Sequence, residues 1–160
     1  MIIVSDTGPL AYLVEIGVAD SLPILYGQVF IPPTVFTELS HEQSPAAAWI
    51  THPPSWLQVA TPQSIPTDLA LDAGEREAIA LALELGAERV LMDEKQGREA
   101  AQSHGLKVAG TLAVILDGAA RYLFDGGTAL DKLADTSFYA SPELLLSVRQ
   151  KLSLNPSRLK

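Results

Sequence analysis

Short apolar runs alternate with amphipathic segments along most of the chain, and this alternation predicts strands and helices in turn. Short apolar runs closed by polar or turn-forming residues are typical of buried strands. Segments with apolar residues three or four positions apart, closed by Gly, are typical of helices. The predicted strands are Met1–Val4, Val29–Ile31, Trp56–Val59, Arg89–Met92 and Leu106–Ala109. The predicted helices are Leu10–Ile16, Thr34–Leu39, Pro45–Ile50, Gly74–Leu85, Glu94–Ser103, Thr111–Ala120, Leu130–Ala134 and Pro142–Leu152.

This order of elements predicts an α/β fold with a parallel sheet that carries helices on both faces. The chain has 160 residues, of which 48% are hydrophobic, and both values suit one domain with a substantial core. We expect a single domain over residues 1–154 and a loose tail over residues 155–160.

The charge balance limits the classes of partner. The chain has 11 Lys and Arg against 19 Asp and Glu, a formal net charge of −8. A protein that coats nucleic acid is expected to be basic, because its affinity comes from neutralising phosphates. A nuclease is not excluded, because bound metal ions can supply the positive charge at the phosphate. The absence of Cys excludes disulfides and thiolate metal sites.

The sequence contains no targeting or membrane signal. The first residues contain no basic region followed by a long apolar run, so no signal peptide is expected. No stretch approaches the roughly 20 apolar residues of a membrane span. We therefore expect a cytoplasmic protein with no membrane segment.

Two aspartates follow predicted strands. Asp6 comes after the first strand and Asp93 after the strand Arg89–Met92. In open α/β sheets, ligands bind outside the carboxyl ends of the strands, so both side chains should lie at one edge of the sheet. Either residue alone could equally be a helix cap.

Two glutamates on predicted helices are further candidates. On a helical wheel Glu75 lies in the middle of the apolar face, which is unusual for an acid unless it faces a cleft or a cation. The alternative is that Glu75 only favours the helix dipole. Glu77 lies at the polar margin and is kept as a substitute for Glu75. Glu38 lies one helical turn after Thr34, soon after the second strand.

Four carboxylates that converge without a cation would repel one another and raise one another's pKa values. Mg²⁺ or Mn²⁺ would remove this conflict, because both ions prefer oxygen ligands. Such an ion can activate water and stabilise charge on a phosphate under attack. Other chemistry has little support: His41, His52 and His104 are scattered, and no zinc-protease, serine-hydrolase, dinucleotide or P-loop motif occurs.

At these residues the chain resembles the PIN-domain family, and within it the VapC-like toxins of prokaryotic toxin–antitoxin pairs. No single matching segment is specific, but the segments occur in the family's order between residue 2 and about residue 116. The matching segments are Ile3–Leu10, Ile31–Leu39, Asp72–Ala82, Val90–Arg98 and Val108–Leu116.

The resemblance implies a three-layer α/β/α sandwich that cleaves single-stranded RNA with Mg²⁺ or Mn²⁺. It carries the family's catalytic and metal-binding acids onto Asp6, Glu38, Glu75 (or Glu77) and Asp93. The third acid is often Asp in this family and is Glu here, so the metal geometry is expected to differ. A homodimer and a small antitoxin partner are also implied, although the sequence does not separate a toxin from a housekeeping nuclease.

Two other functions compete with this interpretation. Asp-Thr-Gly after the first strand suggests a haloacid-dehalogenase-like phosphatase, but such enzymes need a second Asp where Gly8 stands. A PIN-like module without activity, whose acidic surface binds a basic partner segment, is the second alternative. Metal titration separates that module from a nuclease.

Several residues near the acids have two possible roles. Thr7 and Thr111 are expected either to orient a water or a carboxylate, or only to cap a helix. Arg98 and Lys95 could contact RNA phosphates, with solvation favoured for Lys95. RNA bases could stack on three aromatic side chains, those of Phe36, Trp49 and Trp56, although packing within the protein is their favoured role.

Overall fold

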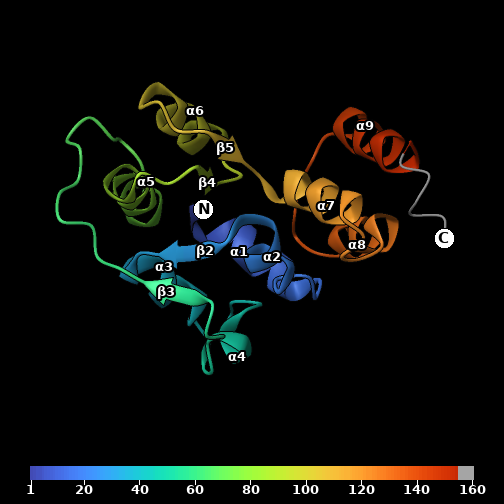
Figure 1. Ribbon diagram of the computed structural model, residues 1–160, viewed down its shortest axis with the longest axis horizontal. Coiled ribbons are helices and arrows are strands. Elements are labelled where there is room, and N and C mark those ends of the chain that lie inside the picture. Colours follow the sequence, from blue (N-terminus) through green and yellow to red (C-terminus); the bar gives the residue numbers. More distant parts are fainter. Residues whose placement is uncertain (155–160) are drawn as a thin grey trace.

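A five-stranded parallel sheet forms the centre of the molecule in the computed structural model, which describes residues 1–154 (Figure 1). The strand order is β3-β2-β1-β4-β5, and every neighbouring pair is parallel. The predicted α/β fold is therefore confirmed. The expected tail, residues 155–160, lies outside the described residues. The strands are β1 (Ile2–Ser5), β2 (Gln28–Ile31), β3 (Leu57–Val59), β4 (Arg89–Leu91) and β5 (Val108–Ala109).

The helices follow the predicted order, with one addition. The short helix α2 was not predicted, because six residues are too few to show a helical repeat and Pro23, in its first turn, is also typical of a loop. α8 begins at Gly126 rather than at Leu130, and α1 at Thr7 rather than at Leu10. The helices are α1 (Thr7–Glu15), α2 (Ser21–Tyr26), α3 (Pro33–Leu39), α4 (Ala47–Ile50), α5 (Ala73–Leu85), α6 (Lys95–Ser103), α7 (Thr111–Ala120), α8 (Gly126–Ala134) and α9 (Pro142–Ser153).

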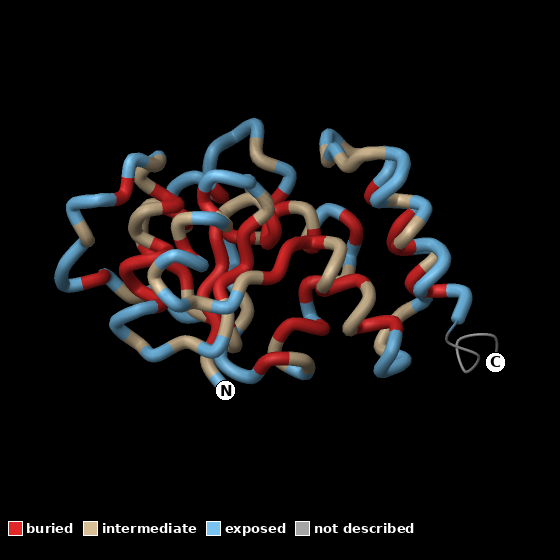
Figure 2. Tube along the Cα trace, turned by 90° about the horizontal axis from the view of Figure 1, so that it is seen from above, coloured by how far each residue is buried: buried red, intermediate tan, exposed pale blue. Residues whose placement is uncertain are grey.

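Two apolar clusters, one on each face of the sheet, make up the core. Successive strand residues point to opposite faces, so Ile3 joins the cluster under α1, α3 and α7, while Val4 joins the cluster under α5 and α6. Both side chains are fully buried. The result is the three-layer α/β/α sandwich that the resemblance implies, with the sheet as its buried middle layer (Figure 2).

The last two helices pack on α7 rather than on the sheet. α8 and α9 contact α7 and each other, and Figure 1 shows them on the right, beside the sandwich. Their buried residues, Leu130 and Leu133 on α8 and Val148 and Leu152 on α9, extend the cluster under α7. Among residues 1–154, every helix is too short or too polar to cross a lipid bilayer.

The order of the strands creates a switch point in the middle of the sheet. From β1 the chain adds β2 and β3 on one side, and it then returns to add β4 and β5 on the other side. Crevices form at such points, because the helices after the two central strands leave on opposite faces. The switch lies between β1 and β4, the two strands that Asp6 and Asp93 follow.

The start of α8 is packed too tightly to accept a methyl group at Gly126. A Cβ there would lie 2.5 Å from Leu152 Cδ2 and 2.8 Å from the Ala119 Cβ. We expect Gly126→Ala to lower the free energy of unfolding by about 1–3 kcal/mol, although Ala is normally the better helix former. Denaturant melts measure this change.

The double variant Ala119→Gly/Gly126→Ala is the matched control for this prediction. It moves the methyl group from α7 to α8 and so removes the closest fixed contact. We expect it to lose less stability than the sum of the two single variants, since neighbouring sites are not additive. Strict additivity would show that the two helices do not collide at this point.

Candidate active site

Asp6 and Asp93 lie side by side at the carboxyl ends of β1 and β4. Ser5 pairs with Leu91 in the parallel ladder, and the Asp6 N–H donates to the Leu91 carbonyl over 2.9 Å. Asp6 is only 8% exposed and sits at the N-cap position of α1, yet its side chain makes no capping hydrogen bond. The capping alternative therefore does not explain Asp6, whose carboxylate stays available at the switch point.

The Asp93 carboxylate is held by the first residue of α7. The Thr111 N–H donates to Asp93 Oδ1 over 2.8 Å, and the Thr111 hydroxyl donates to Oδ2 over 2.7 Å. Thr111 is fully buried, so these hydrogen bonds are protected from water. An anion at a helix N-terminus is also stabilised by the free N–H groups there. Thr111 thus orients a carboxylate, which is one of the two roles expected for it.

Glu38 reaches the same edge from the end of α3. Its Oε1 accepts a hydrogen bond from the Thr7 hydroxyl at the start of α1. A Cβ at Gly74 would lie 2.7 Å from Glu38 Oε1 and 3.4 Å from Asp6 Oδ1. Glu38, Asp6 and the first turn of α5 therefore converge on one point, and Gly74 leaves room for both carboxylates.

Glu75 is buried at the first turn of α5, as its place on the apolar face predicts. The residue is 8% exposed, and Oε2 has no hydrogen-bond partner among the described residues. A Cβ at Gly97 would lie 2.6 Å from that oxygen, so the side chain extends under the start of α6. A buried carboxylate oxygen without a partner is costly, and it marks a position where a cation or a water is needed.

Glu77 points elsewhere. Its Oε2 accepts a hydrogen bond of 2.6 Å from the Thr34 hydroxyl on α3, and the residue is only half-buried. Since a hydrogen bond to a neighbouring helix explains Glu77, the geometry favours Glu75 as the third acid.

Asp72 is a fifth acid at this edge, and it was not among the predicted site residues. It is the N-cap of α5, and its Oδ1 accepts the Glu75 N–H over 2.9 Å. Asp three residues before Glu is a variant of the capping-box pattern and could have drawn attention to the pair. Its charge acts on both Asp6 and Glu75, as their pKa values show.

Burial raises the pKa values of three acids at this edge, and repulsion between neighbouring acids raises those of Asp6 and Glu75 further. The pKa of Asp6 rises to about 7, first through desolvation and then through the charges of Asp72, Glu38 and Asp93, against a lowering by the Thr7 N–H. Desolvation and Asp72 also raise the pKa of Glu75 to about 7. Desolvation raises the pKa of Asp93, against lowering contributions from Thr111 and the Arg98 guanidinium.

This chemistry suits a hard divalent cation. The donors are all carboxylate oxygens, one of them buried without a partner, and their repulsion would be relieved by a positive charge. Within residues 1–154, however, no group of three or more His, Asp or Glu side chains is arranged to hold a metal ion.

One cation faces the acids from α6. Arg98 donates from Nη1 to the Met92 carbonyl over 3.0 Å and lowers the pKa of Asp93. A Cβ at Gly110 would lie 2.7 Å from Asp93 Oδ1 and 2.9 Å from Arg98 Nη1. Lys95 lies farther out, with its side chain 88% exposed and only a weak contact of 3.9 Å to Glu99. These positions match the expectation that Lys95 is solvated.

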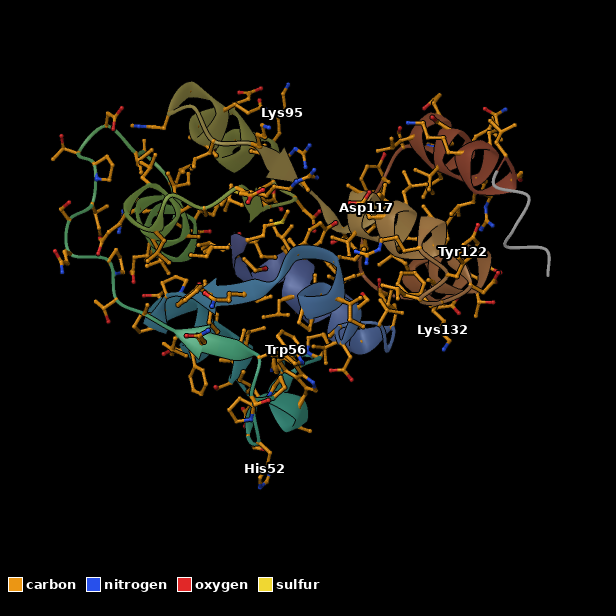
Figure 3. All side chains as sticks on the ribbon, viewed as in Figure 1. His52, Trp56, Lys95, Asp117, Tyr122 and Lys132 are labelled. Carbon is orange, nitrogen blue, oxygen red and sulfur yellow. The ribbon has the colours of Figure 1, made fainter. Side chains whose placement is uncertain are left out.

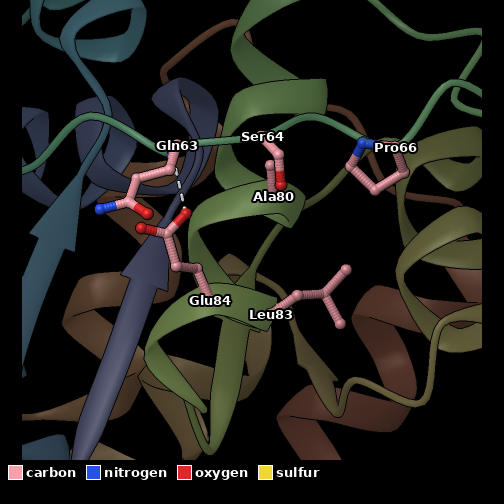
Figure 4. A pocket seen from close by; sticks show the side chains of 6 residues that line it. All are labelled: Gln63, Ser64, Pro66, Ala80, Leu83 and Glu84. Carbon is pink, nitrogen blue, oxygen red and sulfur yellow. Dashed lines mark hydrogen bonds between the residues drawn. The ribbon is translucent and has the colours of Figure 1, made fainter.

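Two surface hollows differ in their chemistry. A cleft of about 340 Å³ opens directly beside Asp93 and Arg98 and continues toward α9. Another hollow, of about 310 Å³, lies between residues 63–66 and α5 (Figure 4). Its acid, Glu84, already accepts the Gln63 N–H over 2.7 Å, and none of the candidate acids lines it. Only the first hollow belongs to the candidate site.

The tryptophans are placed for packing. Trp49 and Trp56 contact each other, with ring centroids 5.8 Å apart, and both pack on the core, as does Phe36. Trp56 directly precedes β3 (Figure 3), whereas Asp6 directly follows β1. Because the strands are parallel, these two residues lie at opposite edges of the sheet. The favoured packing role agrees with this placement.

Comparisons with known proteins identify the family. A family model described as a PIN domain matches residues 2–154. A solved structure of a PilT N-terminus domain protein from the hyperthermophilic archaeon Sulfolobus solfataricus P2 has a TM-score of 0.50 and 15% identity, covering 88% of this chain and 98% of that one. At this identity it shows the fold alone. No curated protein matches the chain significantly. The family match confirms the resemblance drawn from the sequence motifs, and the chain belongs to the PIN-domain family.

Proposed function

We propose that the protein is a metal-dependent endoribonuclease that hydrolyses phosphodiester bonds of single-stranded RNA. The observation that carries the proposal is the group of carboxylates at the β1–β4 switch point, where Asp6 and Asp93 meet Glu38 and Glu75. PIN domains are typically nucleases and generally use divalent metals, which supports the same reaction class.

In this proposal the four acids divide the work. Asp93, fixed by Thr111, and Asp6, fixed by its place after β1, are the rigid ligands of Mg²⁺ or Mn²⁺. Glu38 and Glu75 complete the shell, directly or through water. A bound divalent ion supplies a nucleophilic water and stabilises charge on the phosphate. Arg98, beside Asp93, is placed to attract the phosphate backbone of the RNA.

The biological setting is part of the proposal. A cytoplasmic toxin, held inactive by a small basic antitoxin and forming a homodimer, agrees with the sequence resemblance and with the net charge of −8. Co-expression with the product of the neighbouring gene, followed by pull-down and growth measurements, tests this setting separately from the chemistry.

The deciding experiment compares two glutamates of one helix. We expect wild type to cleave labelled single-stranded RNA with Mn²⁺ and to stop in EDTA. Glu75→Gln should lose on the order of 100-fold in rate, because a buried metal-directed carboxylate is removed. Glu77→Gln should stay within about threefold of wild type, since it loses a hydrogen bond and no ligand. Gel-resolved cleavage rates measure both variants.

Three results would contradict the proposal. Equal rates in the two glutamine variants would remove Glu75 from the mechanism. Cleavage that persists in EDTA would remove the metal. Absence of both cleavage and Mn²⁺ binding would favour the alternative, a non-catalytic PIN-like module that binds a partner protein.

A further inference from the structure

The cleft beside Asp93 contains aromatic and aliphatic side chains that binding of a metal ion by the acids does not need. Its lining combines two charged side chains, Asp93 and Arg98 beside Gly110, with aromatic and aliphatic walls. The walls come from the loop between α8 and α9, through Phe138 and Tyr139, and from α9, through Leu144. A volume of about 340 Å³ lies in the range of small-molecule sites, roughly 300–1,000 Å³.

The loop that presents the aromatic wall is held firmly. Phe138 packs edge-to-face on Tyr12 of α1, with ring centroids 5.3 Å apart, and the Tyr12 hydroxyl is 3.0 Å from the Ser137 hydroxyl. On the other side of Tyr139, the Ser141 side chain caps α9 through the Leu144 N–H. Tyr139 lies between these anchors and remains 84% exposed. A large aromatic ring is therefore displayed on a fixed loop without packing there.

Gly110 leaves space in the cleft between Asp93 and Arg98. A side chain at this position would lie against both Asp93 Oδ1 and Arg98 Nη1, so its absence leaves the carboxylate and the guanidinium open to the cleft. Lys95, the first residue of α6, lies on the side of that helix that faces α9 (Figure 3), and it does not line the cleft. The lining of the cleft thus contains the Arg98 guanidinium from α6 and the exposed ring of Tyr139 from the loop before α9.

We propose that this cleft binds one unstacked base of the RNA strand, with the base on Tyr139 and the adjoining phosphate at Arg98, next to the bond that is cut. Flat aromatic faces stack on bases of any sequence, and guanidinium groups suit phosphates. A base can enter only when it is not paired, so the cleft selects single-stranded over duplex RNA. This inference rests on the proposed nuclease function and adds the residues that choose its substrate.

The test measures RNA affinity and cleavage separately. Asp6→Asn is the background for binding, because it arrests cleavage without touching the cleft. In it, Tyr139→Ala should weaken binding of a fluorescein-labelled single-stranded RNA by roughly 5- to 100-fold by anisotropy, the loss of one stacked base. Tyr139→Phe should keep wild-type affinity. Tyr122→Ala removes another exposed tyrosine, 59% exposed and at the far end of α7, and should change nothing.

The cleavage arm uses the otherwise native sequence. Tyr139→Ala should lower kcat/KM for RNA by a similar factor but leave Mn²⁺-dependent cleavage of an abasic oligoribose phosphate unchanged, because that phosphodiester strand carries no aromatic ring to stack. Equal RNA affinity in Tyr139→Ala and its parent would overturn the proposal. A change in the monomer–dimer distribution with unchanged RNA affinity would also overturn it and assign the cleft to a contact between protein copies. If wild type cleaves neither substrate, the proposed nuclease function is wrong. The anisotropy measurement still shows whether the cleft binds RNA through Tyr139.

Discussion

Asp6→Asn is expected to abolish RNA cleavage and, at the same time, to stabilise the metal-free protein. Asp6 is 8% exposed, and its pKa is raised to about 7, mainly by desolvation and then by the charges of Asp72, Glu38 and Asp93. Asn has the same shape but carries no charge. The variant therefore lacks a charged ligand for the metal ion. It also lacks a buried negative charge that destabilises the folded protein.

The expected sizes follow from the same facts. Loss of a central metal ligand should lower the cleavage rate by on the order of 10³-fold or more. At pH 8 in EDTA, removal of the ionised carboxylate should raise the free energy of unfolding by about 1–3 kcal/mol, less than the full ionisation cost because a buried amide also needs partners. Cleavage gels and thermal melts in EDTA measure the two effects.

Glu88→Gln is the matched control for Asp6→Asn. Glu88 is exposed and precedes β4, so it lies at the opposite edge of the sheet from Asp93, which follows the same strand. This variant also loses one negative charge, but activity and stability should both stay near wild type. An Asp6→Asn protein that retains a tenth of the activity, or that melts earlier than wild type in EDTA, would contradict the expectation.

The position of the two aspartates was predictable because one rule needs only local information. A short apolar run that ends in Asp indicates a strand end, and parallel strands place such ends at one edge. The pairing of β1 with β4 was not predictable in this way. It depends on the return of the chain after β3, and no local pattern encodes that crossover.

Helical periodicity correctly distinguished Glu75 from Glu77 on α5, but it predicts only positions within a helix. The wheel placed Glu75 on the apolar face and Glu77 at its margin, and the structure buries Glu75 and gives Glu77 a hydrogen bond to Thr34. Asp72 was missed because periodicity describes the helix interior, whereas this residue is an exposed cap. Its effect on the pKa of Asp6 acts through space and has no sequence signature.

The cleft beside Asp93 was the least predictable feature. Its walls come from segments that only the packing of α8 and α9 on α7 brings next to β4. In the sequence Tyr139 is one aromatic residue in a loop, while the tryptophans attracted attention as base-stacking candidates. In the structure Tyr139 is the better candidate for base stacking. Trp56 precedes β3, whereas Tyr139 lines the cleft that contains Asp93.

Without divalent metal, the protein is expected to become less stable as the pH rises from about 4 to about 7. The folded-state pKa of Asp6 is raised from 3.8 to about 7 and that of Glu75 from 4.5 to about 7, and the pKa of Asp93 is also raised. A carboxyl with a raised pKa binds its proton more tightly in the folded state than in the unfolded state. Its contribution is complete below the unfolded pKa and is lost as the pH passes through the folded pKa.

The shift of Asp6 alone corresponds to on the order of 4 kcal/mol lost across this interval. In EDTA, the melting temperature should therefore fall between pH 5 and pH 8, and Asp6→Asn should flatten the profile. Mg²⁺ or Mn²⁺ should restore stability most at the upper end, because only ionised carboxylates bind the ion, with a gain of about 2.7 kcal/mol at a hundredfold excess over Kd. A metal-free protein whose stability rises steadily from pH 5 to pH 8 would show that these acids are not held together by the fold, since separated and solvated carboxylates have no reason to keep their protons.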